Sequence, residues 1–133
     1  MNDDLSARLA AAAEAYTPAV TEFLRALVAI PSESAEERAV VERAAAEMRA
    51  LGFDAVQVDG FGNVLGRMGD GPAVVALDGH LDTVGVGDRS TWTRDPYAGT
   101  VEDGVLYGRG ASDQSGGFAA AVYGARIARD LGL

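Results

Sequence analysis

The sequence predicts an α/β domain in which helices cover a mixed β-sheet. Three observations carry this prediction. Apolar residues recur at helical spacing through the first 51 residues, short alternating or continuous apolar runs follow them, and a Gly-rich turn leads into a last helix. The predicted order is therefore two helices, three strands, a long loop and a helix, which is the pattern of a layered α/β domain.

The first helix is predicted over residues 5–29. Its apolar stripe consists of Leu9, Ala12, Tyr16, Val20, Phe23, Leu24 and Leu27. Pro18 interrupts the stripe, and because proline fits the first turn of a helix, Thr17 either caps a second segment or marks a kink. The helix should end before Pro31, since a residue that precedes proline avoids helical backbone angles.

A second helix is predicted to open with a capping box and to run to about Leu51. Ser34 stands three residues before Glu37, the spacing at which a serine N-cap and a glutamate satisfy each other's backbone amides. Gly52 is a typical helix stop. The Glu36-Glu37 pair is accordingly interpreted as structural. The expected inner face consists of Val40, Val41, Ala44, Ala45 and Met48.

Strands are expected next along the chain. Residues 55–59 alternate between polar and apolar, 60–62 form a turn, and 63–68 return, which predicts a hairpin. Residues 73–77 are continuously apolar, which is typical of a strand covered on both faces.

The last third of the chain is predicted to be a loop, a hairpin and a helix. Residues 85–104 are rich in Gly, Asp, Ser and Thr, with Trp92 and Tyr97 as anchors, and a short hairpin surrounds Asp103-Gly104. Residues 113–131 are expected to be helical. Their inward side chains are predicted to be Phe118, Val122, Ile127 and Leu131.

The composition argues against several classes of partner and site. A net charge of −9 disfavours nucleic acid and anionic membranes as partners. The absence of cysteine excludes disulfides, thiolate nucleophiles and Cys-ligated zinc, and it fits a reducing compartment. The start is acidic where a signal peptide is basic, and no apolar run approaches the roughly 20 residues of a membrane span. We therefore expect a cytoplasmic protein.

The only histidine, His80, follows the predicted strand 73–77, at the end where open α/β sheets place their sites. Residues i and i+2 of an extended chain point the same way, so the Asp82 carboxylate can orient the imidazole, as carboxylates do for metal-bound histidines. A site that needs two histidines cannot close within this chain. The alternative is a solvated loop histidine with a chance aspartate nearby.

The second candidate element is a Gly-rich turn that brings Asp113 to a predicted helix N-terminus. Gly108 and Gly110 let the backbone bend sharply. The turn lacks a full GxGxxG pattern and a P-loop lysine, and its ending on aspartate favours a cation over a phosphate. Two alternatives stay open, an N-cap role for Asp113 and a phosphate-binding turn.

These two elements belong to a longer ordered set of motifs. The set consists of Gly79 to Val84, Trp92, Asp95 to Tyr97, Asp103 to Asp113 and Gly116-Gly117, with Leu27 to Ser32, Gly52-Phe53 and Gly62 to Val64 upstream. Taken in order, these motifs resemble the zinc-dependent exopeptidase and deacylase family of acetylornithine deacetylase, succinyl-diaminopimelate desuccinylase, aminoacylase and carboxypeptidase G. Residues 85–88 and 111–114 are similar to a YgeY-like branch of that family.

The resemblance implies a three-layer αβα zinc-peptidase-like catalytic domain with a mixed sheet. His80 would ligate one of two Zn²⁺ ions, with Co²⁺ or Mn²⁺ possible, and Asp113 would bridge both. Asp82 would serve catalysis by orienting His80, and the Asp113-Gln114 peptide would be cis. The implied reaction is hydrolysis of an amide bond in a small N-acyl amino acid or peptide, through a metal-bridging water.

The resemblance also implies that the site is incomplete. Gln114-Ser115 stands where relatives often carry Met-Lys, which leaves the ligand intact. The family's general base belongs to a later Glu-Glu pair, and further ligands follow it. Residues 1–133 are thus expected to be the N-terminal part of the metal-binding catalytic domain, inactive alone, without the lid domain through which relatives form homodimers. The alternative is a non-catalytic module that keeps the fold.

Overall fold

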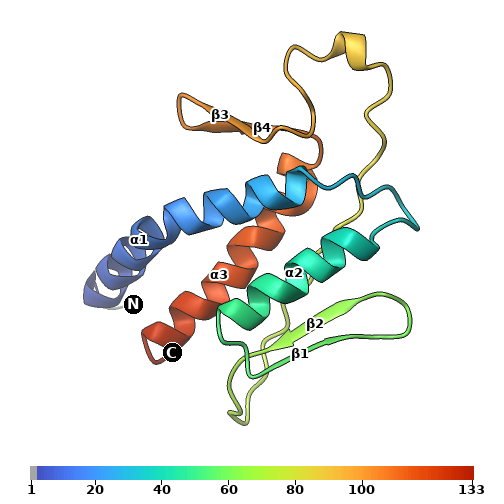
Figure 1. The fold of residues 1–133 in the computed structure, drawn as a ribbon. Coiled ribbons are helices and arrows are strands. Elements are labelled where there is room, and N and C mark those ends of the chain that lie inside the picture. Colours follow the sequence, from blue (N-terminus) through green and yellow to red (C-terminus); the bar gives the residue numbers. More distant parts are fainter. Residues whose placement is uncertain (1–2) are drawn as a thin grey trace.

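The computed structural model describes residues 3–133 as three helices and two β-hairpins. The helices are α1 (Asp3–Val28), α2 (Arg38–Ala50) and α3 (Gly116–Asp130), and they lie between the two hairpins (Figure 1). The α/β class is confirmed. The two sheets are separate antiparallel pairs, however, and parallel pairing within residues 3–133 is limited to one isolated bridge, Glu33 to Thr83.

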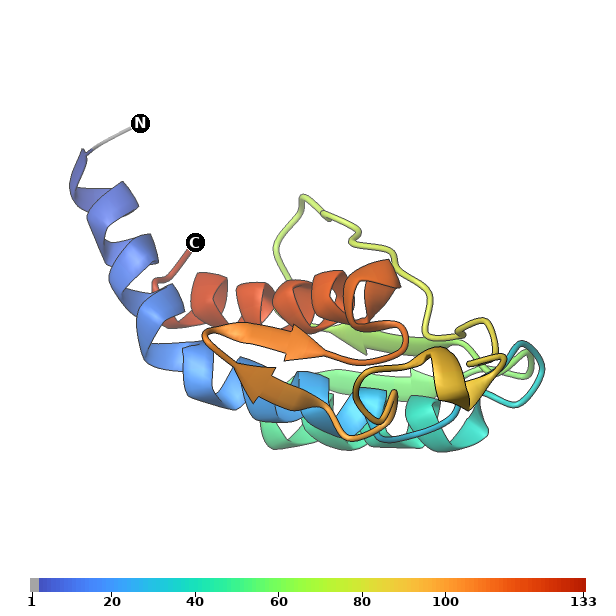
Figure 2. The same cartoon turned by 90° about the horizontal axis from the view of Figure 1, so that it is seen from above.

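Helix α1 is continuous through Pro18 and changes direction part-way along its length (Figure 2). Proline removes one backbone donor and crowds the preceding turn, which bends a helix without ending it. Two threonine hydroxyls bond backwards into the same stretch, Thr17 to the Ala13 carbonyl at 3.0 Å and Thr21 to the Thr17 carbonyl at 2.8 Å. The expected kink is therefore the better of the two interpretations of Thr17-Pro18.

The apolar stripes of α1 and α2 form one core together with α3. The five residues predicted for the inner face of α2 are its buried residues. Phe23 of α1 lies 6.2 Å from Tyr123 of α3 between ring centroids, and Tyr16 lies 5.6 Å from Tyr123. The core cluster consists of Phe23, Leu27, Val40, Val41, Ala44, Met48, Leu81, Ala119, Val122 and Tyr123.

The predicted capping box of α2 is wrong. The helix begins at Arg38, its N-cap is Glu37, and no side chain caps it. The Glu37 carboxylate accepts from the Ala35 amide at 2.8 Å, while the Ser34 hydroxyl bonds to Asp82, 48 residues away. Ser34 therefore does not stand at the N-cap position, because the left-handed turn at Ala35, φ +74°, directs the chain away before the helix begins at Arg38.

The first hairpin pairs β1 (Ala55–Val58) with β2 (Val64–Arg67), as predicted. The Asp59 carboxylate closes its turn by accepting from the amides of Phe61 and Asn63, both at 2.9 Å. One face lies against α2, so closely that a side chain at Gly66 would collide with Met48.

The predicted strand over residues 73–77 is absent. The segment is irregular, and Val74, Val75 and Leu77 are 89%, 85% and 66% exposed. A continuous apolar run becomes a buried strand only where neighbouring strands and helices cover it. Within residues 3–133 no strand pairs with this segment, so its composition does not produce the structure that it predicts.

The second hairpin joins β3 (Thr100–Glu102) to β4 (Val105–Tyr107) through Asp103-Gly104, as expected. Both turn residues have positive φ, 50° and 78°, the geometry of a tight hairpin turn. A short helix, η1 (Arg89–Thr91), interrupts the loop before it. No helix in the described part of the chain is both long enough and apolar enough to cross a membrane.

Candidate metal centre

The three residues singled out in the sequence come together. His80 and Asp82 lie in the extended segment before the long loop, and Asp113 lies in the turn η2 (Ala111–Ser115) that precedes α3. His80 Nε2 is 3.2 Å from Asp113 Oδ1, across 33 residues of sequence. The imidazole is thus held between the two aspartates, with Asp82 on its Nδ1 side and Asp113 on its Nε2 side.

The ring of His80 has a defined proton arrangement. Its Nδ1 lies 3.0 Å from the Asp82 carbonyl oxygen and 3.2 Å from Asp82 Oδ1, and both oxygens can only accept. Nδ1 must therefore carry the proton, which leaves the Nε2 lone pair directed at Asp113 when the ring is neutral. The Asp82 carbonyl, followed by the Asp113 carboxylate, raises the pKa of His80 above its ordinary 6.5.

Asp82 is held from its other end by Ser34, a residue that the sequence did not mark as functional. The Ser34 hydroxyl donates to Asp82 Oδ2 at 2.6 Å, and this bond is the main cause of a lowered pKa at Asp82. Asp82 thus remains ionised beside the ring. The capping-box pattern had assigned the Ser34 hydroxyl elsewhere, and no local signal in the sequence points to a partner 48 residues away.

Asp113 owes its position to Gly110 and the turn that follows. Gly110 has φ +74°, and a Cβ there would come within 2.4 Å of Thr83, so glycine is required on both counts. Asp113 has non-helical angles, φ −120° and ψ 97°, and its peptide bond to Gln114 is cis, as the resemblance implies. Because α3 begins only at Gly116, the predicted helix start at Asp113 is wrong, and so is the N-cap alternative.

The donor atoms fit a metal ion. Zinc binds imidazole nitrogen and carboxylate oxygen at roughly 2.0–2.2 Å with tetrahedral angles, which places two ligand atoms about 3.3 Å apart. The observed separation of His80 Nε2 and Asp113 Oδ1 is 3.2 Å. The pair lines a cavity of about 250 Å³. The other residues that line this cavity are Asp82, Thr83, Val84 and the turn residues 108–112.

The donor set is also small. Within residues 3–133 no cluster of three or more His, Cys, Asp or Glu side chains has the arrangement of a metal site. His80 and Asp113 therefore offer two ligands, with Asp82 behind one of them, and both side chains are accessible, at 45% and 90% exposed.

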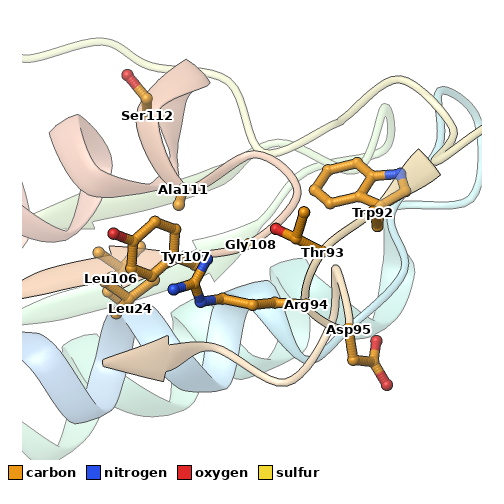
Figure 3. Close-up of a pocket in the computed structure, with 10 residues that line it drawn as sticks. All are labelled: Leu24, Trp92, Thr93, Arg94, Asp95, Leu106, Tyr107, Gly108, Ala111 and Ser112. Atoms are coloured by element: carbon orange, nitrogen blue, oxygen red, sulfur yellow. The ribbon is translucent and has the colours of Figure 1, made fainter. Parts of the chain in front are cut away.

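A larger cavity of about 420 Å³ shares the turn residues Gly108, Ala111 and Ser112 but none of the three candidate site residues (Figure 3). Arg94 crosses it with its guanidinium 3.9 Å from the centre of the Tyr107 ring and pairs with Glu102. Its other charged residue, Asp95, pairs with Arg89, so both charged side chains that line this cavity already have ion-pair partners outside its lining.

Comparison with known proteins agrees with the motifs. Residues 76–133, which contain all three candidate residues, match the sequence model of peptidase family M20/M25/M40. The chain is 52% identical over 121 residues to the uncharacterized protein YgeY of Escherichia coli strain K12, an alignment that covers 91% of this chain. The chain belongs to the M20/M25/M40 peptidase family. Other M20 relatives are succinyl-diaminopimelate desuccinylases, one from Cereibacter sphaeroides, 41% identical over 100 residues, and one from Stenotrophomonas maltophilia, 38% over 109.

The alignments cover most of this chain but less than a third of each relative. The alignments cover 72% and 80% of this chain for the two desuccinylases, but 26% and 29% of those enzymes, and 30% of YgeY. The chain thus spans about 30% of the length of the curated relatives that it matches.

Proposed function

We propose that these residues form part of the active site of a metal-dependent hydrolase that cleaves an amide bond in a small N-acyl amino acid or peptide. The observation that carries the proposal is the 3.2 Å approach of two atoms that can each ligate a metal, His80 Nε2 and Asp113 Oδ1. When the ring is neutral and its proton is on Nδ1, both atoms present an electron pair. His80 and Asp113 would hold a divalent cation in this state, and the cation would supply the positive charge that a protonated ring otherwise provides.

Zinc is the metal proposed, with cobalt or manganese as substitutes, because the donors are one imidazole and one carboxylate. Two ions are proposed, bridged by Asp113. The support for bridging is that the Asp113 side chain is 90% exposed, so that its second oxygen is accessible to a second cation. His80 would be a terminal ligand, and Asp82 would position it.

When bound, the metal pair supplies Lewis-acid polarisation of the scissile carbonyl and activation of water. The chain's own residues prepare the two ligands for this task. The Asp82 carbonyl and carboxylate hold the proton on His80 Nδ1, so Nε2 stays available to the metal. The Gly110 turn holds Asp113 opposite it.

The proposed reaction needs groups that these residues do not assemble. No cluster of three ligands forms in the described part of the chain, and the Glu36-Glu37 pair lies at the start of α2, outside the residues that line the 250 Å³ cavity. We therefore propose that residues 1–133 alone are inactive, and that the base, the remaining ligands and a lid domain that forms a homodimer belong to a complete protein of the relatives' length. We also propose that this protein is cytoplasmic, which the absence of cysteine from residues 1–133 supports.

The proposed substrate class is taken from the names of the relatives. Two of the named relatives are succinyl-diaminopimelate desuccinylases, a name that describes removal of a succinyl group from an amino acid. N-succinyl and N-acetyl amino acids are the first compounds to test. Hydrolysis by the complete protein, and none by residues 1–133, is the expected result. Clear turnover by the 133-residue chain would show that the base lies within it.

The metal assignment is tested by replacing His80 with alanine. Structural zinc sites bind with roughly 10–16 kcal/mol over four ligands, so loss of one ligand should weaken zinc binding about 100-fold. Isothermal titration with zinc measures this, and Asp113→Asn should act in the same direction. Asp78→Asn, an exposed aspartate two residues before His80, serves as the charge control.

The alternative is a non-catalytic module that has kept the fold, favoured by the absence of a three-ligand cluster in residues 3–133. Metal content of the complete protein distinguishes the two. About two zinc or cobalt ions per chain after reconstitution supports the hydrolase, whereas fewer than one supports the module. Unchanged metal content in His80→Ala would mean that His80 is not a ligand.

A further inference from the structure

Both carboxylate oxygens of Asp82 contact another side chain. Oδ1 lies 3.2 Å from His80 Nδ1, and Oδ2 accepts a hydrogen bond from Ser34 at 2.6 Å. Ser34, Asp82, His80 and Asp113 therefore form one continuous row of contacts, from the segment before α2 to the turn before α3. The Asp82 side chain is 38% exposed, so the protein does not enclose it on other sides.

Ser34 is itself held by backbone contacts that do not involve its hydroxyl. The segment Ser32 to Ser34 runs parallel to Leu81 to Thr83, with one bridge between Glu33 and Thr83. The Thr83 amide donates to the Ser32 carbonyl at 2.8 Å, and the buried Ser32 hydroxyl donates to the Leu81 carbonyl at 2.9 Å. The two segments are thus fixed in register, and this register places the Ser34 hydroxyl over Asp82.

The chain turns away immediately after Ser34. Ala35 has a left-handed backbone, φ +74°, and the Glu36 amide donates back to the Glu33 carbonyl at 2.8 Å. This turn holds Ser34 at the end of the paired segment, directed at Asp82 rather than at the start of α2.

We propose that Ser34 is a positioning residue of the site, which fixes the rotation of the Asp82 carboxylate and through it the ring of His80. That these residues belong to a metal site rests on the proposed function, whereas the contacts of Ser34 with Asp82 and of Asp82 with His80 are present without a metal. Without the hydroxyl, Oδ2 loses its protein partner and the carboxylate can rotate about its last bond. Oδ1 then leaves Nδ1, and the Asp82 carbonyl is the one remaining partner on the Nδ1 side of the ring.

The test compares Ser34→Thr with Ser34→Val, two side chains of the same shape of which only threonine keeps the hydroxyl. Ser34→Ala is a third variant. His80 is the only histidine, so the two imidazole nitrogens give unambiguous NMR signals without any metal. In Ser34→Thr we expect both nitrogen shifts to stay near those of the wild type. In Ser34→Val and Ser34→Ala we expect them to move towards the averaged values of a ring that exchanges tautomers.

Zinc affinity is the second measurement. Groups that orient a metal ligand typically contribute 10–100-fold in affinity. Ser34 acts one step further out, so we expect Ser34→Val to bind zinc about 3–10-fold more weakly, and Ser34→Thr to stay within about twofold of the wild type. Ser90→Ala, in the exposed helix η1, controls for loss of a serine hydroxyl elsewhere.

The outcomes separate this inference from the proposed function. If folded Ser34→Val shows the wild-type nitrogen shifts, or if Ser34→Thr shifts as much as Ser34→Val, Ser34 does not position Asp82. If the wild type binds no zinc but the imidazole still responds to loss of the hydroxyl, the metal proposal fails and the positioning role of Ser34 stands.

Discussion

Ala35 combines a left-handed backbone with an ordinary side chain, at the turn that directs Ser34 to Asp82. Its φ is +74°, and apart from glycines only Asp103 shares a positive φ among residues 3–133. A Cβ in this region clashes with the following carbonyl at a cost of about 1–2 kcal/mol. The Ala35 amide is nevertheless bonded to Glu37, and the Glu36 amide to Glu33, so the turn is held by its own hydrogen bonds.

Replacing Ala35 with glycine should therefore stabilise the fold. Removing the Cβ relieves the clash of about 1–2 kcal/mol, while the greater freedom of glycine in the unfolded chain costs roughly 0.5–1 kcal/mol. The free energy of unfolding should therefore rise by about 0.5–1 kcal/mol. Urea unfolding measures the change. Ala46→Gly, at an exposed position inside α2, is the control and should destabilise by about 1 kcal/mol. Equal losses in both variants would show that Ala35 is not strained.

At the residue scale, the sequence was informative where a contact is local. His80 and Asp82 are two residues apart in an extended segment, and their contact was predicted from that spacing. The meeting of His80 with Asp113 could be inferred only from the family resemblance, since 33 residues separate them. Ser34 was missed because a capping box is a local competitor for the same hydroxyl, and only the tertiary fold decides between them.

The β1–β2 hairpin is tied to the end of α3 by one arginine. Arg129 donates to the Gly52 carbonyl and to the Asp54 carboxylate, and Asp54 also accepts from the Gly69 amide at 2.7 Å. The Arg129 bond, followed by the Gly69 bond, lowers the pKa of Asp54 below 3.8. A carboxyl group with a depressed pKa stabilises the fold above its unfolded pKa, and this contribution disappears as the pH falls through the folded value.

Asp54→Asn should consequently destabilise the protein at neutral pH and lose this effect in acid. Urea unfolding at pH 7, 5, 4 and 3 measures the difference between wild type and variant, which should be constant at the two higher values and shrink as the pH falls below 3.8. Asp70→Asn, an exposed aspartate in the turn after β2, controls for removal of one negative charge. A difference that does not change with pH would mean that the ionised carboxylate of Asp54 is not what stabilises the hairpin.

At the element scale, periodicity predicted the helix faces better than the helix ends. The stripe of α1, the inner face of α2 and both hairpins have the predicted residues, because apolar side chains must be buried whatever surrounds them. The starts of α2 and α3 were predicted too early. At each, a turn with a left-handed residue, Ala35 or Gly110, sends the chain elsewhere before the helix begins.

For the molecule as a whole, the segment 73–77 is the main disagreement between sequence and structure. Its composition is that of a strand buried on both faces, yet Val74 and Val75 are 89% and 85% exposed. Burial on two faces requires strands on both sides and helices above and below, and residues 3–133 supply no strand that pairs with it. No pattern within five residues can report whether those neighbours are present.

This exposed run should govern how the 133-residue chain associates in solution. Unpaired, β-prone apolar backbone is a template for pairing between molecules. Val75→Asp removes one apolar side chain, worth about 1.5 kcal/mol when buried, so the concentration at which the chain associates should rise about tenfold. Sedimentation velocity across a concentration series measures this.

Phe61→Asp is the matched control for that prediction. Phe61 is 96% exposed at the tip of the first hairpin, but it stands alone among polar and glycine neighbours. If association depends on exposed apolar area in general, Phe61→Asp should raise the threshold as much as Val75→Asp does. If it depends on a continuous unpaired run, as we predict, Phe61→Asp should change it little, since an isolated aromatic side chain offers no backbone ladder to a second molecule.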